Sequence, residues 1–338
     1  MNRSAADCLV LFDTSVEGRL SGGWASGVLT QRTKTVKAGP MLYMDCYPIW
    51  NTKTYRAAKT EAEQERHRKA QAKLNKRNAE AKLTRLLDEN FCRYDLSVTL
   101  KYNDGESPED ERQALKDVQN YIKRIKYLRN KRGLTPIRYI YVIEETNGAR
   151  GHRFHAHVVM SGDGITMDEA EKTWTGHIKG YTNMGKVMPG TDEQRPNLAH
   201  LAHYMLDDTK IERTMEKDGK NPQKRAMKRM WNCSKNLRDP DDYATTADKK
   251  ISVRKVQKIA ETMNDLEQAE AIFAKLYPDY KLVLKETKDG EIRPDIEAKR
   301  SRWTTGIYVR AVVRRKEKRP PGGGKNGEKQ APCRTRRI

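Results

Sequence analysis

Hydrophobic and polar residues alternate along Asp95–Tyr102 (DLSVTLKY), which is the pattern of a β-strand with one buried face. Tyr139–Ile143 and Arg153–Met160 read as two further strands, and the polar turn between them predicts a hairpin. Residues 108–128 show an apolar stripe at helical spacing, and a capping box begins a second helix at 166–174. The order strand, helix, strand, strand, helix predicts an α+β fold: an antiparallel sheet with helices on one face.

Shifts in composition divide the chain into four expected parts. The first combines a loosely ordered start at 1–38 with an edge strand at 40–50 and a long basic helix at 57–90. The parts are 1–90, the α+β domain at 91–240, a C-terminal helix and strands at 241–316, and a disordered basic tail at 317–338.

Other segments have weaker signals for regular structure. They are expected as strands or helices from their apolar spacing and from the turn residues that bound them. These elements are a strand at 180–187, helices at 198–208 and 266–276, and strands at 280–284 and 306–313.

Basic residues are in large excess. The 338 residues include 67 Lys and Arg against 46 Asp and Glu, which gives a formal net charge of +21. This surplus favours a polyanionic partner, most simply nucleic acid, although ribosome association or binding to an anionic membrane would give the same charge. The five cysteines are scattered and show no metal-binding spacing, which favours a reducing cytoplasm. Neither a secretory signal nor an apolar run of about 18 residues is found, so no membrane partner is expected.

The second hairpin strand contains two histidines that are two residues apart. His155 and His157 therefore point to the same face, while Ala156 points to the opposite face. Two imidazoles on a rigid strand can hold one divalent ion, and Glu145 or Glu144 on the neighbouring strand can supply a carboxylate. This donor set with open positions suits Mn²⁺, Mg²⁺ or Zn²⁺ as a Lewis acid. The alternative is that the histidines are surface residues without a ligand.

A tyrosine, Tyr204, lies on the polar face of the helix at 198–208, with His200 and with Asp207 or Asp208. Its hydroxyl, with an ordinary pKa near ~10, is a weak nucleophile unless its target is polarised. A metal held by the two histidines could polarise a phosphate, and attack by the tyrosine would then give a phosphotyrosine ester and a free 3′-hydroxyl. The alternative is a tyrosine packed between helix and sheet.

Together, the strand DLSVTLKY, the His-hydrophobic-His strand FHAHVVM and the helix AHYMLDD resemble the HUH endonuclease superfamily. Within it, the chain is similar to the rolling-circle replication initiators of plasmids and phages of Gram-positive bacteria. The similarity extends over roughly residues 40–316 and includes the segments LNKRNAEAKLTRLLDENF, GYTNMG, MWNCSKNL and GIYVRAVVRRK.

The resemblance implies an RRM-like sheet with helices on one side, and cleavage of one DNA strand at an origin. It implies that His155 and His157 are metal ligands and that Tyr204 is the nucleophile. A third ligand is expected on the adjacent strand, where Glu145 is favoured over Glu144 because it leads directly into the turn. Mn²⁺ and Mg²⁺ are favoured over Zn²⁺.

The chain departs from the family pattern beside the tyrosine. The family commonly has a lysine three residues after it, but that position is Asp207 here, and Lys210 lies nearly two helical turns beyond Tyr204. The motif contains one tyrosine, which predicts an enzyme with a single nucleophile. Tyr181 is the reserve candidate for that role.

The expected function is therefore an initiator that nicks single-stranded origin DNA, remains on the 5′ end and leaves a 3′-hydroxyl for a host polymerase. No convincing nucleotide-binding loop is found, so a host helicase is expected as a further partner. Two alternatives remain. One is a relaxase or transposase with the same chemistry, and the other is a non-catalytic basic protein that binds nucleic acid.

Overall fold

The chain divides into two compact units in a computed structural model, which describes residues 30–49, 60–148, 151–188, 197–206, 230–287, 289–300 and 306–316. Unit 1 comprises mainly residues up to Arg85 together with Asp239–Arg319, and unit 2 comprises mainly Leu86–Pro189 and Leu198–Arg238. The parts expected at 1–90 and 241–316 thus contribute to one unit. None of the described helices combines the length and the apolar character needed to cross a bilayer.

Unit 2 contains an antiparallel sheet with strand order β6-β3-β5-β4-β7 among the described residues. The last turn of the long helix α2 (Glu61–Asn90) also belongs to this unit. The other elements are β3 (Leu96–Tyr102), α3 (Glu111–Lys131), β4 (Tyr139–Gly148), β5 (Gly151–Met160), α4 (Met167–Thr175), β6 (Gly180–Lys186), α5 (Ala199–Met205) and β7 (Asn232–Cys233).

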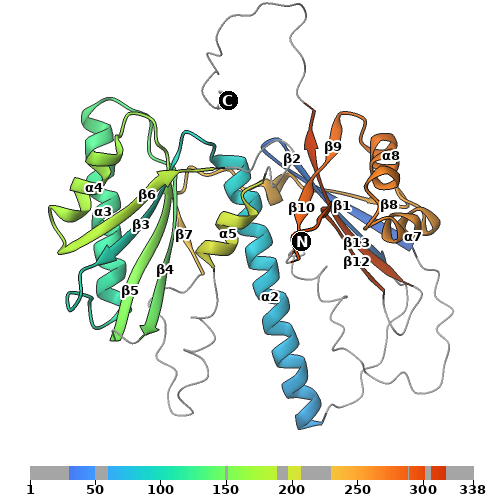
Figure 1. The fold of residues 1–338 in the computed structure, drawn as a ribbon, viewed down its shortest axis with the longest axis horizontal. Coiled ribbons are helices and arrows are strands. Elements are labelled where there is room, and N and C mark those ends of the chain that lie inside the picture. Colours follow the sequence, from blue (N-terminus) through green and yellow to red (C-terminus); the bar gives the residue numbers. More distant parts are fainter. Residues whose placement is uncertain are drawn as a thin grey trace, which may run out of the picture. The chain divides into compact units, whose positions relative to one another are not determined.

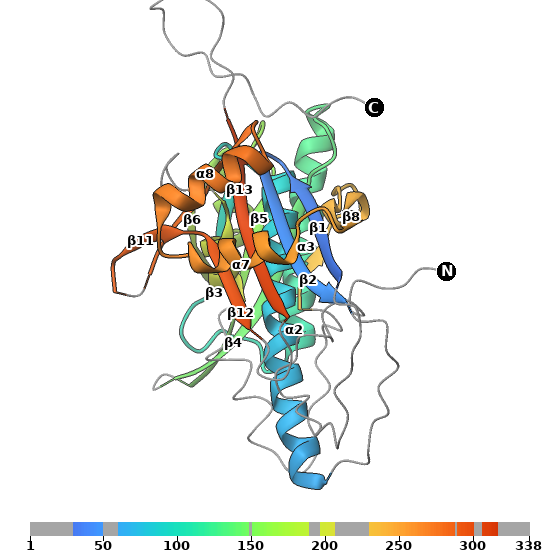
Figure 2. The same cartoon turned by 90° about the vertical axis from the view of Figure 1, so that its right-hand side faces the viewer.

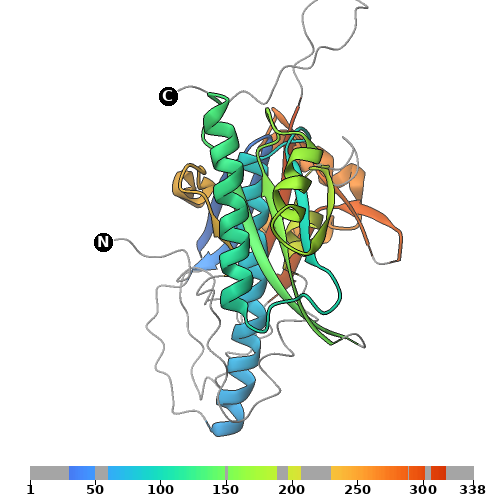
Figure 3. The ribbon, with the colours of Figure 1, turned by 90° about the vertical axis from the view of Figure 1, so that its left-hand side faces the viewer.

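The helices α3 and α4 cover one face of this sheet (Figures 1 and 3). Alternate residues of β3, such as Leu96 and Leu100, are buried there with Ile125 of α3 and Trp174 of α4. The short helix α5 lies on the opposite side of the sheet (Figure 1). The predicted α+β fold is therefore confirmed, because the strands of this unit pair antiparallel and one face carries the two amphipathic helices.

Unit 1 contains a second antiparallel sheet, with strand order β12-β13-β2-β1-β8 and with β9 paired to β13. The helices α7 and α8 pack on this sheet (Figure 2) and share an apolar core with β2 and β13. The elements are β1 (Thr30–Ala38), β2 (Met41–Ile49), η2 (Pro240–Tyr243), β8 (Thr245–Asp248), α7 (Val253–Glu261), α8 (Leu266–Leu276), β9 (Tyr280–Leu282), β10 (Leu284–Glu286), β11 (Ile292–Pro294), β12 (Ile296–Arg300) and β13 (Ile307–Arg315).

The first strand of unit 1 corrects the expectation of loose order over residues 1–38. Residues 30–38 form β1, which pairs with β2 along its whole length. Its sequence, TQRTKTVKA, has few apolar residues, so its own alternation does not indicate a strand. The strand forms because polar Gln31 and Thr33 are buried in hydrogen bonds with the thiol of Cys46. The residues before Thr30, and the basic tail expected from 317, lie outside the described residues.

Gly180 sets how closely β6 approaches β3. A Cβ added there would overlap the carbonyl oxygen of Lys101 and lie 2.8 Å from Nε1 of Trp174. These two groups are joined by a hydrogen bond of 3.0 Å. We expect Gly180→Ala to break this bond and to destabilise unit 2 by about 1–3 kcal/mol, the usual cost of overpacking. The measurement is the urea midpoint of unfolding followed by near-UV circular dichroism.

Gly185→Ala is the matched control on the same strand, because a Cβ at Gly185 would meet no atom within 4 Å. Its urea midpoint is expected to stay at the wild-type value or to rise slightly. Equal losses in the two variants would show that contact with Lys101 and Trp174 is not the reason for the glycine.

Candidate active site

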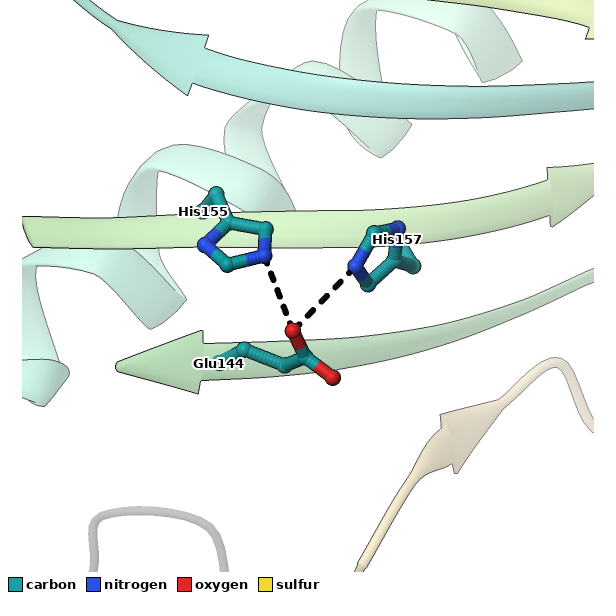
Figure 4. Close-up of side chains that lie close together, drawn as sticks. All are labelled: Glu144, His155 and His157. Atoms are coloured by element: carbon teal, nitrogen blue, oxygen red, sulfur yellow. Dashed lines mark hydrogen bonds and ion pairs between the residues drawn. The ribbon is translucent and has the colours of Figure 1, made fainter. Parts of the chain in front are cut away.

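The neighbouring strands β4 and β5 carry the three side chains of the candidate metal centre. Their register pairs Glu144 with His155 and Val142 with His157. Directly paired residues point to the same face of a sheet, and residues two apart on one strand share a face. Ala156 is buried in the core on the opposite face, as its position in the sequence predicts. Figure 4 shows Glu144, His155 and His157 directed toward one another.

One carboxylate oxygen joins the three residues. Oε2 of Glu144 lies 2.8 Å from Nε2 of His155 and 3.3 Å from Nε2 of His157. Glu144 and His157 are buried, and the side chain of His155 is 13% exposed. Burial raises the pKa of the Glu144 carboxyl, but hydrogen bonds from the two histidines outweigh burial and lower this pKa to about 2. Glu144 is therefore an anionic ligand group across the physiological pH range.

This group fits a divalent metal ion. Its two imidazole nitrogens and one carboxylate oxygen all lie within 4.8 Å of one another. Imidazole and carboxylate together suit first-row divalent metals, and an anionic ligand offsets part of the ion's charge. Over the described ranges, no other group of three His, Cys, Asp or Glu residues meets this distance condition. The group could thus bind a metal, with one side open toward the exposed edge of His155.

The sequence favours Glu145 as the third ligand, but the geometry does not fit that preference. The strand β4 continues past Ile143 to Gly148, so both glutamates lie within a paired strand and not in the turn. Glu145 pairs with Phe154, which is buried in the core beneath α3 and α4. Because neighbouring residues of a strand point to opposite faces, Glu145 lies on the side away from the histidines.

The helix α5 brings Tyr204 to the same face of the sheet. Its ring lies against the ring of His157, with centroids 4.6 Å apart at an interplanar angle of 64°. The side chain remains 54% exposed, so its hydroxyl is accessible to a substrate. The start of α5 is held by Asp88 of α2, whose carboxylate accepts a hydrogen bond of 2.8 Å from the backbone N–H of Leu198. A residue 47 positions after His157 is thereby brought into ring contact with it.

The residues expected beside Tyr204 fall partly outside the described part of the chain. Asp207, Asp208 and Lys210 lie outside the described residues. His200 is on α5 and exposed. The reserve candidate Tyr181 lies on β6 with its side chain 44% exposed, and β3 separates it from β5.

Thr99 is a residue of this site that sequence reasoning did not single out. It is buried on β3, where it pairs with His157, and its Oγ1 lies 3.2 Å from Nδ1 of His157. A hydroxyl can donate or accept, so Thr99 holds the ring with Nε2 toward Glu144 in either tautomer. The alternation of DLSVTLKY places Thr99 off the core face, but its pairing with His157 depends on the strand register, which the sequence does not show.

We expect Thr99→Val to weaken divalent-metal binding by about tenfold, because the ring of His157 loses the contact that orients it. Valine has nearly the same shape, and so packing on β3 is preserved. The measurement is Mn²⁺ titration by isothermal calorimetry, with thermal melting as a check on folding. Thr99→Ser keeps the hydroxyl and is expected to bind Mn²⁺ like the wild type. If both variants bind like the wild type, Thr99 does not orient the ligand.

The comparison with protein families supplies one match, and it covers these elements. Residues 95–209 match the family model of the replication-associated protein ORF2. The matched residues run from the start of β3 through β5 to the helix of Tyr204. The match supports the resemblance at the level of a replication-associated protein and is consistent with a rolling-circle replication initiator. Comparisons with curated proteins and with solved structures give no significant match.

Proposed function

We propose that this chain is a rolling-circle replication initiator that nicks single-stranded origin DNA in the cytoplasm by attack of Tyr204 on a phosphodiester. The observation that carries the proposal is the ring contact between exposed Tyr204 and His157, a member of the buried Glu144–His155–His157 group. A nucleophile and a potential metal centre thus lie on one face of one sheet, within the segment that matches replication-associated proteins.

In the proposed reaction, His155, His157 and Glu144 hold Mn²⁺ or Mg²⁺, which when bound polarises the scissile phosphate and stabilises the charge on its oxygens. The Tyr204 hydroxyl loses its proton to water, and its oxygen forms a bond to phosphorus. The bond from phosphorus to the 3′-oxygen breaks, and that oxygen takes up a proton. The products are a 5′-phosphotyrosine link and a free 3′-hydroxyl. Because an ester replaces an ester, rejoining the strand needs no nucleotide hydrolysis.

The same chemistry could serve a relaxase or a transposase. The family match favours replication over transfer, because the family is described as replication-associated. In that role the free 3′-hydroxyl primes synthesis by a host polymerase, and a host helicase unwinds the duplex. The net charge of +21 favours association of the chain with the DNA backbone.

The proposal is tested with single-stranded oligonucleotides that tile the DNA flanking the gene. Each is labelled at its 3′ end, incubated with the full chain and Mn²⁺ or Mg²⁺, and resolved on a denaturing gel. One tile is expected to give a labelled band at the protein's mass. EDTA is expected to prevent its formation.

A non-catalytic DNA-binding protein would behave differently. It would retard the oligonucleotides in a salt-sensitive manner without a band that survives denaturation. Binding to the tiles with no covalent species in either metal would therefore reject the nicking proposal.

A further inference from the structure

Four residues form one row across the sheet of unit 2, perpendicular to its strands. Glu144 on β4 pairs with His155 on β5, His155 pairs with Lys101 on β3, and Lys101 pairs with Tyr181 on β6. Directly paired residues point to the same face, so the row continues the candidate metal centre toward the edge of the sheet. Neighbouring strands are about 4.8 Å apart, which places Tyr181 about 10 Å from His155 across this face.

The outer end of this row is open and combines an aromatic ring with a cation. Tyr181 is 44% exposed, and Nζ of Lys101 lies 5.6 Å from the centre of its ring. Asn183 follows on the same face and is also exposed. A Cβ added at Gly185, the next residue on that face, would meet no atom within 4 Å.

The backbone beneath this pair is held firmly. The carbonyl of Lys101 accepts a hydrogen bond of 3.0 Å from the buried indole of Trp174, and Gly180 permits the close approach that this requires. The ring and the ammonium group are therefore presented from paired strands and not from a loop. A rigid platform loses little conformational entropy when a ligand binds.

We propose that Tyr181 and Lys101 form a subsite for an unpaired nucleotide next to the phosphate at the metal centre. The base stacks on the Tyr181 ring, and the adjoining phosphate pairs with the Lys101 ammonium group. Aromatic side chains stack on any base whose partner strand is absent, and lysine provides the phosphate charge contact. The subsite selects single-stranded over duplex DNA, because a base in a duplex is already stacked on both sides. It rests on the proposed function, which brings the strand to this face.

Binding without cleavage tests the subsite. The probes are a fluorescein-labelled thymidine oligonucleotide of about 16 nucleotides, within the site sizes of single-strand binders, and an abasic chain of equal length. Anisotropy is measured in EDTA. Tyr181→Ala is expected to weaken binding of the thymidine probe about tenfold and to leave binding of the abasic probe unchanged. Tyr181→Phe, which keeps the ring, is expected to restore affinity. Lys101→Gln is expected to weaken binding of both probes and to lower the salt slope by about 0.7.

Tyr127→Ala is the matched control, since Tyr127 is 66% exposed on α3, which covers the other face of the sheet. Its affinity is expected to equal that of the wild type. The subsite is refuted if Tyr181→Ala binds thymidine like the wild type, or if Tyr181→Phe binds as weakly as Tyr181→Ala. The two proposals fail separately. A covalent band from the tiling experiment with normal binding by Tyr181→Ala would remove only the subsite, whereas weakened binding with no covalent band would remove only nicking.

Discussion

Tyr204→Phe is expected to abolish the covalent protein–DNA species, lowering the rate of its formation by about 10⁴-fold or more. The substitution removes the attacking oxygen and keeps the ring that lies against His157. Folding, Mn²⁺ binding and affinity for single-stranded DNA should therefore stay close to the wild type. The measurement is the rate at which the labelled band forms on a denaturing gel, with Mn²⁺ saturating.

Tyr127→Phe removes a hydroxyl from another exposed tyrosine of the same unit and should form the band at the wild-type rate. Mass spectrometry of the digested adduct should place the nucleotide on the peptide that contains Tyr204. An adduct on the peptide that contains Tyr181 instead, or an undiminished band in Tyr204→Phe, would take the nucleophile's role away from Tyr204.

Glu144→Gln is expected to weaken Mn²⁺ binding by about 100-fold or more, since it removes a ligand itself and even a residue that only supports a ligand contributes about 10- to 100-fold. The buried carboxylate is the anionic member of the group, and its pKa of about 2 keeps it charged. An amide supplies a neutral oxygen in the same volume. Calorimetric titration of Mn²⁺ measures the loss, and the covalent band should fall in parallel.

Glu145→Gln is the control that the strand register offers. Glu145 is the next residue along β4 but pairs with Phe154 on the core face, so its substitution should leave Mn²⁺ affinity near the wild-type value. The opposite result, in which Glu145→Gln loses the metal and Glu144→Gln keeps it, would mean that β4 and β5 pair one residue out of the register described here.

This pair of variants shows where sequence reasoning reaches its limit. The two-residue period of a strand is a local property, and it was enough to place His155 and His157 together and Ala156 in the core. The choice between Glu144 and Glu145 depends on which residue of β4 lies opposite His155. A shift of one residue exchanges the two faces, and no pattern within the hairpin excludes such a shift.

Local patterns also decided most elements of unit 2. Apolar spacing and the capping box at Thr166 predict α3 and α4, because an amphipathic stripe and a cap act within a few turns of the chain. The strand β1 in unit 1 was not predicted, since its polar residues are buried against a partner strand that its own sequence does not reveal.

The sequence alone determined the strands and helices that carry the chemistry, the residue types present on them and the basic charge that favours DNA. Only the tertiary structure decided which of these residues meet. The contact between Tyr204 and His157 depends on the capping of α5 by Asp88, and the row from Glu144 to Tyr181 depends on three strand pairings. Each involves residues far apart in the chain, and such contacts arise from packing of the whole unit and not from local preference.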